Sequence, residues 1–240
     1  MPWYYAVAER DHEIQNPTSA EKIALLGTYL RLGPETRVID LACGKAGPAT
    51  LLASTFGCRI LGIERSPEFV EAARERVLAA GVGDLVEIVE ADAHAVTLEA
   101  GAWDAALCLG ASFVWDDLPG TLAALTPAVR PGGHVVVGEP YWRQWPLPRG
   151  TDDLGFVAVR ETVARLESAG LSLAAMIASS EDDWDRYESL HWRALEEWLA
   201  ANPRDADAPE IRERHERARD DYLRFERELL GWAIFIGRKS

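Results

Sequence analysis

The chain has 240 residues, of which 48% are hydrophobic, so it is long enough and apolar enough to bury one large α/β core. Its formal net charge of −14 argues against a nucleic-acid partner, because phosphate backbones are bound mainly through cationic side chains. No apolar run approaches the length of a membrane span, and the start Met1-Pro2-Trp3-Tyr4-Tyr5 lacks the pattern of a secretory leader. We therefore expect a cytoplasmic protein without membrane contacts; the sequence does not indicate an oligomeric state.

Helices and strands alternate from residue 18 onward. Thr18 and Glu21 form a possible capping box for a first helix, which ends at Gly33-Pro34. Five strands are predicted from apolar runs at 37–41, 59–63, 85–89, 105–109 and 135–138. Helices are predicted between them at 48–56, 66–81 and 117–129. Strands separated in this way favour a parallel sheet with right-handed crossovers.

The carboxyl-terminal part is less regular. We predict a helix at 157–168, a strand at 171–178, a long amphipathic helix at 181–201 and a final strand at 232–236. Residues 209–230 predict a charged, solvated helix with ion pairs among Glu213, Arg217, Asp220, Arg224 and Arg227. The helices between residues 180 and 230 are interpreted as an insertion or lid before the last strand.

Residues 38–47, with the sequence Val-Ile-Asp-Leu-Ala-Cys-Gly-Lys-Ala-Gly, form the most informative motif: a strand, a turn of small residues and the start of a helix. Gly44 allows a ligand to approach the backbone closely, and Gly47 opens a helix whose amide groups favour a carboxylate. The spacing Ala42-x-Gly44-x-x-Gly47 also nearly matches the dinucleotide fingerprint. A nicotinamide-dependent enzyme is therefore an alternative at this point.

Asp40, which ends the first predicted strand, separates the two interpretations by charge. A dinucleotide would bring its anionic pyrophosphate over this turn, where an acidic side chain is unfavourable. S-adenosylmethionine instead brings an ammonium group, which suits Asp40, and a carboxylate, which suits the helix amides. The competing view, that Asp40 only caps a turn, is less favoured because the strand–turn–helix context fits the motif.

Two more acidic residues follow the next two strands. Glu64 ends the second strand, where a carboxylate can accept both ribose hydroxyls of an adenosine-bearing cofactor. Asp92 follows the third strand and can accept from an adenine amino group, while the amide of Ala93 meets a ring nitrogen. These acids lie at the carboxyl edge of successive strands, where ligands of open α/β sheets bind. The predicted cofactor-binding residues are Asp40, Ala42, Gly44, Gly47, Glu64, Arg65, Asp92, Ala93 and Leu109.

In this order the motifs resemble those of class I S-adenosylmethionine-dependent methyltransferases, over about residues 36–139. Ala42 stands where many members have glycine, an exchange that we expect to require a negative φ. Segments 16–17, 138–144, 184–188 and 198–203 are similar to an uncharacterised bacterial branch of that superfamily. The resemblance implies a Rossmann-like, seven-stranded, mostly parallel sheet with a reversed final strand and helices on both faces. It also implies S-adenosylmethionine as cofactor and S-adenosylhomocysteine as product, with no known acceptor.

On this basis we expect one methyltransferase domain. It would comprise an amino-terminal cap and helix (1–35), a cofactor-binding half (36–139) and a substrate-side half with the helical insertion (140–240). The predicted activity is methyl transfer to a small molecule by in-line displacement. The alternatives are a module that binds S-adenosylmethionine without catalysis and a Rossmann enzyme using another adenosyl cofactor such as NAD.

The acceptor side is predicted where the fifth strand leaves the same edge of the sheet. Tyr141 and Trp142 are interpreted as a pocket wall, although aromatic residues here can simply pack the loop. Glu139 is the candidate base or acceptor-positioning residue; a base is needed only if the acceptor still carries its proton when it attacks.

Other candidates lie on the long helix and near the ends of motifs. One stripe of the long helix carries Trp184, Tyr187, His191, Leu195 and Trp198. Such a stripe is more typical of a packing face than of a binding site, and Tyr187 or His191 is the residue expected to turn inward toward the site. Trp115, His12 and His94 lie near motif ends and are further candidates. No Cys, His and carboxylate residues have the spacing of a metal site, so no metal is expected. The cysteines Cys43, Cys58 and Cys108 are expected to be buried, reduced thiols.

Overall fold

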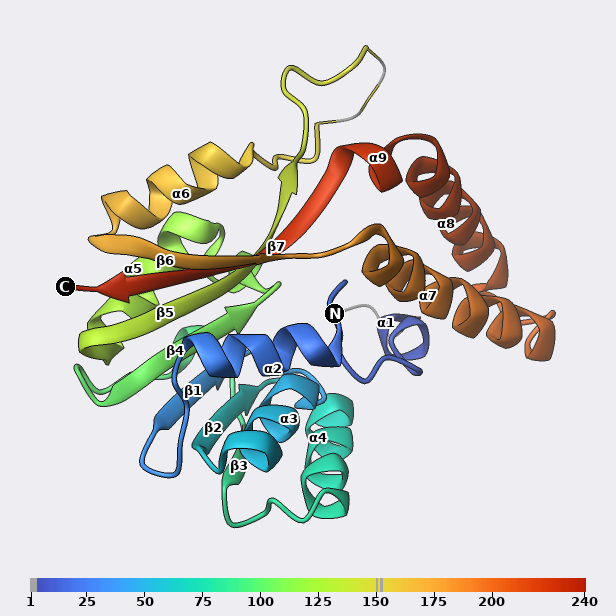
Figure 1. Cartoon of the computed structure of the whole chain (residues 1–240). Coiled ribbons are helices and arrows are strands. Elements are labelled where there is room, and N and C mark those ends of the chain that lie inside the picture. Colours follow the sequence, from blue (N-terminus) through green and yellow to red (C-terminus); the bar gives the residue numbers. More distant parts are fainter. Residues whose placement is uncertain (1–3, 150, 152) are drawn as a thin grey trace.

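A seven-stranded sheet forms the centre of the computed structural model, which describes residues 4–149, 151 and 153–240 (Figure 1). The strands lie in the order β3-β2-β1-β4-β5-β7-β6. Their bounds are β1 Arg37–Leu41, β2 Arg59–Glu64, β3 Val86–Glu90, β4 Trp103–Leu109, β5 Val129–Trp142, β6 Leu171–Ala178 and β7 Leu230–Lys239. Only β7 runs antiparallel to its neighbours, β5 and β6. This confirms the predicted mostly parallel sheet with a reversed final strand.

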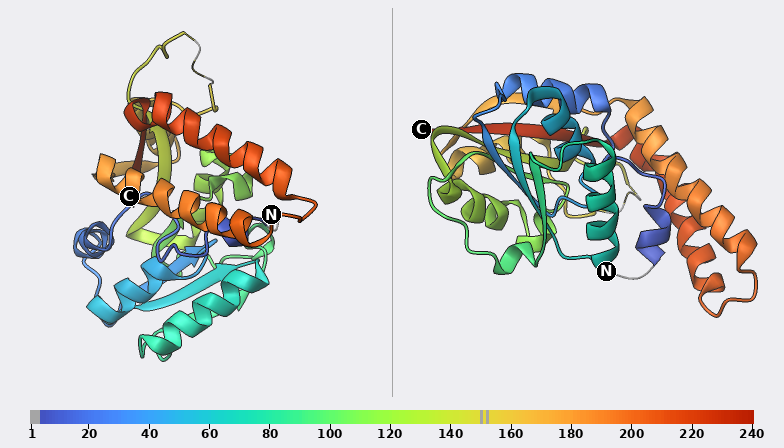
Figure 2. Two further views of the ribbon diagram at one scale, coloured as in Figure 1. Left: turned by 90° about the vertical axis from the view of Figure 1, so that its right-hand side faces the viewer. Right: turned by 90° about the horizontal axis from the view of Figure 1, so that it is seen from below.

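The helices lie on both faces of the sheet and beyond one of its ends. They are α1 Tyr4–Ala8, α2 Ala20–Tyr29, α3 Gly47–Phe56, α4 Pro67–Ala79, α5 Leu118–Ala128, α6 Val159–Ser168, α7 Glu181–Ala201, α8 Ala208–Asp221 and α9 Arg227–Leu229. Helices α7 and α8 form a pair that projects away from the sheet (Figure 2). Short turns of 3₁₀ helix follow β3 (Ala93–Ala95) and β4 (Ser112–Trp115).

Alternating side chains of the buried strands supply two separate cores. Val38 packs with Leu52 of α3 on one face, whereas its neighbour Ile39 packs with Leu122 of α5 on the other. Successive residues of a strand point to opposite faces, so a strand that is covered on both sides must be apolar throughout. The continuous apolar runs in the sequence are explained by this double coverage.

The predicted elements differ from the structure at several places. The first helix is capped by Ser19, whose hydroxyl accepts from Lys22 N (3.3 Å), rather than by Thr18. Strand β5 continues past Gly138 to Trp142, because β7 pairs with it over that length. The charged segment 209–230 is not one α-helix: a π-helical turn, Tyr222–Glu226, interrupts it and buries the ring of Tyr222.

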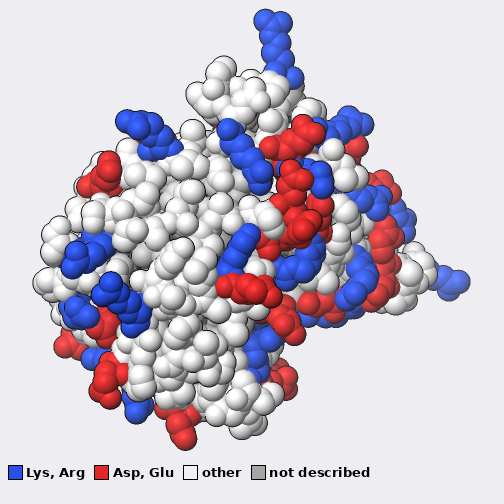
Figure 3. Space-filling model, viewed as in Figure 1, with Lys and Arg blue, Asp and Glu red and all other residues white. Residues whose placement is uncertain are grey.

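The surface charge is distributed unevenly. In Figure 3, acidic and basic side chains crowd over the side that carries α7 and α8, and much of the remaining visible face is uncharged. The ion pairs predicted for the segment 209–230 are confirmed for Glu213 with Arg217 (2.7 Å) and Asp220 with Arg224 (2.9 Å). No helix in the described part of the chain is both long and apolar enough to cross a membrane. Residues 1–3, which belong to the segment that argued against a leader, lie outside the described residues.

The three cysteines are free and buried, as predicted. Burial is the main cause that raises the pKa of the Cys58 thiol, to about 11, so this group stays protonated at neutral pH.

Candidate functional site

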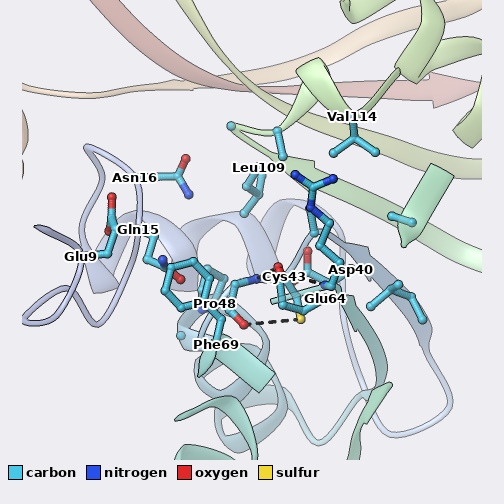
Figure 4. Close-up of a pocket in the computed structure, with 18 of the residues that line it drawn as sticks. Glu9, Gln15, Asn16, Asp40, Cys43, Pro48, Glu64, Phe69, Leu109 and Val114 are labelled. Atoms are coloured by element: carbon cyan, nitrogen blue, oxygen red, sulfur yellow. Dashed lines mark hydrogen bonds between the residues drawn. The ribbon is translucent and has the colours of Figure 1, made fainter. Parts of the chain in front are cut away.

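A cavity of about 450 Å³ opens at the carboxyl ends of β1, β2, β3 and β4 (Figure 4). Its walls are the turn after β1, the loops after β2, β3 and β4, the amino-terminal segment and one residue of α7. The structure brings all the predicted cofactor-binding residues to this cavity: Asp40, Ala42, Gly44, Gly47, Glu64, Arg65, Asp92, Ala93 and Leu109. The topology therefore gathers residues from four separate strand ends into one concave site.

Asp40 places an unpartnered carboxylate in the wall of this cavity. Its side chain is buried, and no described residue donates a hydrogen bond to it. Burial raises the pKa of Asp40 to about 7, and the nearby carboxylate of Glu64 adds to the rise. Asp40 does not cap a turn in this structure. Instead it presents a buried acidic group that a cation in the cavity would stabilise.

Glu64 organises the backbone around the cavity. Its Oε1 accepts from Arg65 N (2.9 Å) and Ser66 N (2.8 Å), and its Oε2 accepts from Gly44 N (3.1 Å). A carboxylate offers about four acceptor positions, so three backbone donors leave roughly one position, on Oε2. Glu64 thus joins the turn after β1 to the start of α4 and retains one acceptor site for a ligand.

Asp92 and Ala93 follow β3 and line the cavity two strands away from Asp40, which lies on β1. Asp92 is exposed, and its Oδ1 accepts from the backbone amide of His94 (3.0 Å), which caps the 3₁₀ turn. Its second carboxylate oxygen has no hydrogen-bond donor among the described residues. Ala93 is buried beside it, so this corner offers one free acceptor next to an apolar wall.

The turn after β1 adopts left-handed backbone angles at three positions. Ala42 has φ of 56°, Gly44 has 56° and Ala46 has 54°. The expectation of a negative φ at Ala42 is therefore wrong. The tight reversal from strand to helix requires left-handed residues here, and two of these positions carry a Cβ that makes the angle unfavourable.

Ala42→Gly is expected to stabilise the protein by about 0.5–1 kcal/mol. Removing the Cβ relieves about 1–2 kcal/mol of left-handed strain, and the added freedom of the unfolded chain costs about 0.4–1 kcal/mol in return. Urea unfolding would measure the change. The matched control is Ala72→Gly inside helix α4, where the same exchange should destabilise by about 1 kcal/mol. A loss of stability for Ala42→Gly would contradict the assignment of strain.

The amino-terminal segment supplies a wall that the sequence did not predict. Gln15 accepts from Lys45 N (2.7 Å) across the turn after β1, and the Lys45 ammonium donates to the carbonyls of Glu9 (2.6 Å) and Arg10 (3.1 Å). The lining residues from this segment are Tyr5, Glu9, Glu13, Gln15 and Asn16. Residues 9–16 have no helical or strand period, so the only sequence signal was the Asn16-Pro17 pair within the resemblance.

Tyr187 and His191 of α7 turn toward this segment. Tyr187 lines the cavity and donates a long hydrogen bond to Glu9 Oε1 (3.5 Å). His191 lies behind it, with Nε2 at 2.9 Å from the same oxygen. Burial lowers the pKa of His191, but hydrogen bonds to Glu188 and Glu9 outweigh burial and raise it to about 9. The rest of the stripe packs, as Trp184 does in the core and Leu195 and Trp198 do against α8.

The residues predicted to form the acceptor wall after β5 do not line this cavity. Tyr141 packs edge-on against Phe235, and Trp142 is buried in the opposite core, because β5 continues as a paired strand and sends alternate side chains to the two faces. Trp115 packs against the core beside α5 and also stays off the cavity wall. The loop-packing alternative therefore describes Tyr141 and Trp142 better.

Glu139 lies near the cavity but is not one of its lining residues. Its Oε1 accepts a hydrogen bond from the hydroxyl of Ser112. Burial raises the pKa of Glu139 to about 7, opposed by the hydrogen bond from Ser112. A base role for Glu139 would require a path through Ser112, which belongs to the loop after β4 and lies between two residues that line the cavity, Ala111 and Phe113.

Comparisons with known proteins agree with this geometry. A family profile described as "Methyltransferase domain" matches residues 38–133. The chain is 32% identical to the uncharacterized protein YjhP of Escherichia coli K12, over 98% of this chain and 97% of that protein. It is 30% identical to a trans-aconitate 2-methyltransferase of Paracidovorax citrulli, over 70% of this chain and 68% of that enzyme.

A solved structure shows the same arrangement over the whole chain. It is a SAM-dependent methyltransferase from Thiobacillus denitrificans in complex with S-adenosyl-L-homocysteine. The two chains are 32% identical and superpose with a TM-score of 0.93, covering 100% of this chain and 99% of the other.

Proposed function

The chain belongs to the class I S-adenosylmethionine-dependent methyltransferases, and from this premise we propose that it transfers a methyl group from S-adenosylmethionine to a small-molecule acceptor. The observation that carries the proposal is Asp40, a buried carboxylate in the cavity wall without a hydrogen-bond donor among the described residues. A buried charge without a partner is unfavourable, so a cationic ligand would stabilise this carboxylate. The ammonium and sulfonium of S-adenosylmethionine supply that charge, whereas the diphosphate of NAD would add negative charge beside Asp40 and Glu64.

The cavity residues fit the other parts of this cofactor. We assign the ribose to Glu64, through the one acceptor position that its backbone donors leave on Oε2. The adenine amino group is assigned to the free oxygen of Asp92, with the amide of Ala93 facing the ring. Gly44 and Gly47 keep the turn open for the carboxylate at the start of α3.

The protein aligns the two substrates and excludes water from them, and it forms no covalent bond with either. When bound, S-adenosylmethionine supplies a methyl carbon already activated by its sulfonium. The loop after β4, with Phe113 and Val114, and the residues Glu9 and Tyr187 opposite it then hold the acceptor in line and exclude water. Glu139 stands one residue behind this wall, so we keep it as a positioning candidate through Ser112.

A small acceptor agrees with the size and charge of the site. A cavity of about 450 Å³ is typical of small-molecule sites. The net charge of −14 opposes a nucleic-acid acceptor. The relative named as a trans-aconitate 2-methyltransferase acts, by its name, on a small acid, which supports an acceptor of this size without naming it.

Calorimetric titration with S-adenosylhomocysteine and with NADH tests the cofactor assignment. We expect one S-adenosylhomocysteine site per chain and no heat from NADH. Binding of NADH instead would overturn the proposal.

Turnover distinguishes an enzyme from a module that only binds the cofactor. Radiolabelled S-adenosylmethionine would be incubated with a panel of small carboxylic acids, amines, phenols and thiols. We expect methyl transfer to at least one class. Tight cofactor binding without transfer to any of them would favour the non-catalytic alternative.

A further inference from the structure

Three residues from opposite ends of the chain form a compact cluster beside the cavity. Glu9 follows α1, His12 lies four residues before Asn16, and His191 belongs to α7. One ligand atom from each residue lies within 4.8 Å of the other two. Glu9 is 8% exposed and His12 is 1% exposed, so water competes little for these atoms.

His12 and Glu9 face each other with unsatisfied acceptors. The Nε2 of His12 lies 2.9 Å from the carbonyl oxygen of Tyr187 and therefore donates to it. In the neutral ring this leaves Nδ1 as a lone pair, and it faces Glu9 Oε2 at 3.5 Å. Neither of these two buried atoms has a hydrogen-bond partner among the described residues. Two buried lone pairs at this separation repel unless a positive species lies between them.

His191 approaches Glu9 from the other side, where its ring is hydrogen-bonded to the second carboxylate oxygen. Its Nε2 is 2.9 Å from Glu9 Oε1, and its Nδ1 is 3.9 Å from Glu188 Oε2. Each imidazole thus has its far nitrogen beside an oxygen acceptor and its near nitrogen aimed at Glu9. Histidines that bind metal ions are held in this way by outer oxygen atoms, which fix the ring and its tautomer.

The nearest basic side chain does not neutralise the cluster directly. The ammonium of Lys45 donates to the backbone carbonyls of Glu9 and Arg10 rather than to the Glu9 carboxylate. Transition metals bind the neutral imidazole and the ionised carboxylate, so a metal ion here would displace the proton through which His191 bonds to Glu9.

We propose that Glu9, His12 and His191 bind one divalent transition-metal ion such as zinc. Two imidazoles and one carboxylate are a donor set that zinc uses in sites that keep a fourth position open. Metal–ligand bonds of about 2.0–2.2 Å place neighbouring ligand atoms roughly 3 Å apart. Here His191 Nε2 lies 2.9 Å from Glu9 Oε1, His12 Nδ1 lies 3.5 Å from Glu9 Oε2, and one ligand atom from each residue falls within 4.8 Å of the other two. Because Glu9 also lines the cavity, the open position would lie on the side of the acceptor, and the ion would tie the amino-terminal segment to α7.

The test uses full-length protein without a polyhistidine tag, stripped with a chelator and titrated with Zn²⁺ and with Co²⁺. We expect one ion per chain, visible absorption bands from bound Co²⁺, and a higher melting temperature with Zn²⁺. His191→Ala and Glu9→Gln should each weaken Zn²⁺ binding at least about 100-fold. The control His94→Ala removes an exposed histidine away from the cluster and should bind Zn²⁺ as the wild type does.

Folding of the variants is checked independently of the metal, by circular dichroism and by urea unfolding. Glu9→Gln preserves the shape of the side chain, so it distinguishes loss of a ligand from loss of the fold. Stripped wild-type protein that takes up no stoichiometric Zn²⁺ or Co²⁺ would overturn the proposal. So would unchanged binding in both variants. Either result would indicate that the cluster holds a proton rather than a metal ion, and neither bears on cofactor binding at Asp40.

Discussion

Asp40→Asn should weaken S-adenosylhomocysteine binding about 100-fold and, in the same chain, stabilise the ligand-free protein above pH 7. Removing one partner of a buried charge pair costs about 2–5 kcal/mol of binding, which corresponds to about 30-fold or more. Titration calorimetry at pH 8 measures the loss. The control is Asp84→Asn, an exposed acid far from the cavity, which should bind as the wild type does.

The gain in stability follows from the pKa of Asp40. Burial raises this pKa from 3.8 to about 7 in the folded protein, so the unfolded chain loses its proton first as pH rises. Between about pH 4 and 7 the folded state holds more protons, and the unfolding free energy falls as pH increases. The difference of about 3 units sets a ceiling of about 4 kcal/mol above pH 7, and asparagine removes this penalty.

The sign of this stability change is tested by the melting temperatures of the wild type and Asp40→Asn at pH 5 and pH 8, without cofactor. The variant should exceed the wild type at pH 8 by more than at pH 5. Wild-type affinity for S-adenosylhomocysteine should also decline from pH 8 to pH 6, because the ligand must then displace a proton from Asp40. A variant that melts lower than the wild type at pH 8, or that binds with full affinity, would contradict the role given to this carboxylate.

Gly47→Ala should destabilise the protein by about 3 kcal/mol and sharply reduce cofactor affinity. A Cβ at Gly47 would lie less than 3.0 Å from the backbone carbonyl oxygen of Glu13, which cannot rotate away as a side chain can. The amino-terminal segment would have to shift, and overpacking of this kind costs about 1–3 kcal/mol or more. The cavity would lose the wall formed by Glu13 and Gln15.

Gly83→Ala is the matched control, since a Cβ there meets no atom within 4 Å. Urea unfolding and calorimetry would be compared for the two variants. Position 47 is the first residue of α3, where alanine is intrinsically preferred over glycine. A stabilised Gly47→Ala protein would therefore show that helix propensity outweighs the packing and that the segment is free to move.

The sheet, and the gathering of the predicted cofactor residues at one of its edges, could be predicted from sequence because the signals are local. Asp40, Glu64 and Asp92 each end or follow a strand, and parallel topology brings such ends to one edge. The left-handed φ at Ala42 could not be found, since alanine is a poor indicator of that conformation.

The position of the residues after the fifth strand depends on long-range pairing. The apolar run ends at Gly138, whereas pairing with β7 extends β5 to Trp142 and turns Tyr141 and Trp142 away from the cavity wall. The cluster of Glu9 and His191 joins residues 182 positions apart, and no spacing rule connects them. Only the tertiary structure brings the aperiodic first residues against α7.

The cavity has lining residues from Tyr5 to Val114, and α7 adds one more, Tyr187. On the ribosome, the first five strands in chain order can assemble while α7 and the antiparallel β7 are still missing. A nascent chain at that stage would have the nucleoside corner at Glu64 and Asp92 but would lack Tyr187 and His191 beside Glu9. The nucleoside part of a ligand could thus bind before synthesis ends, whereas a chain halted before residue 181 would lack the wall that α7 contributes.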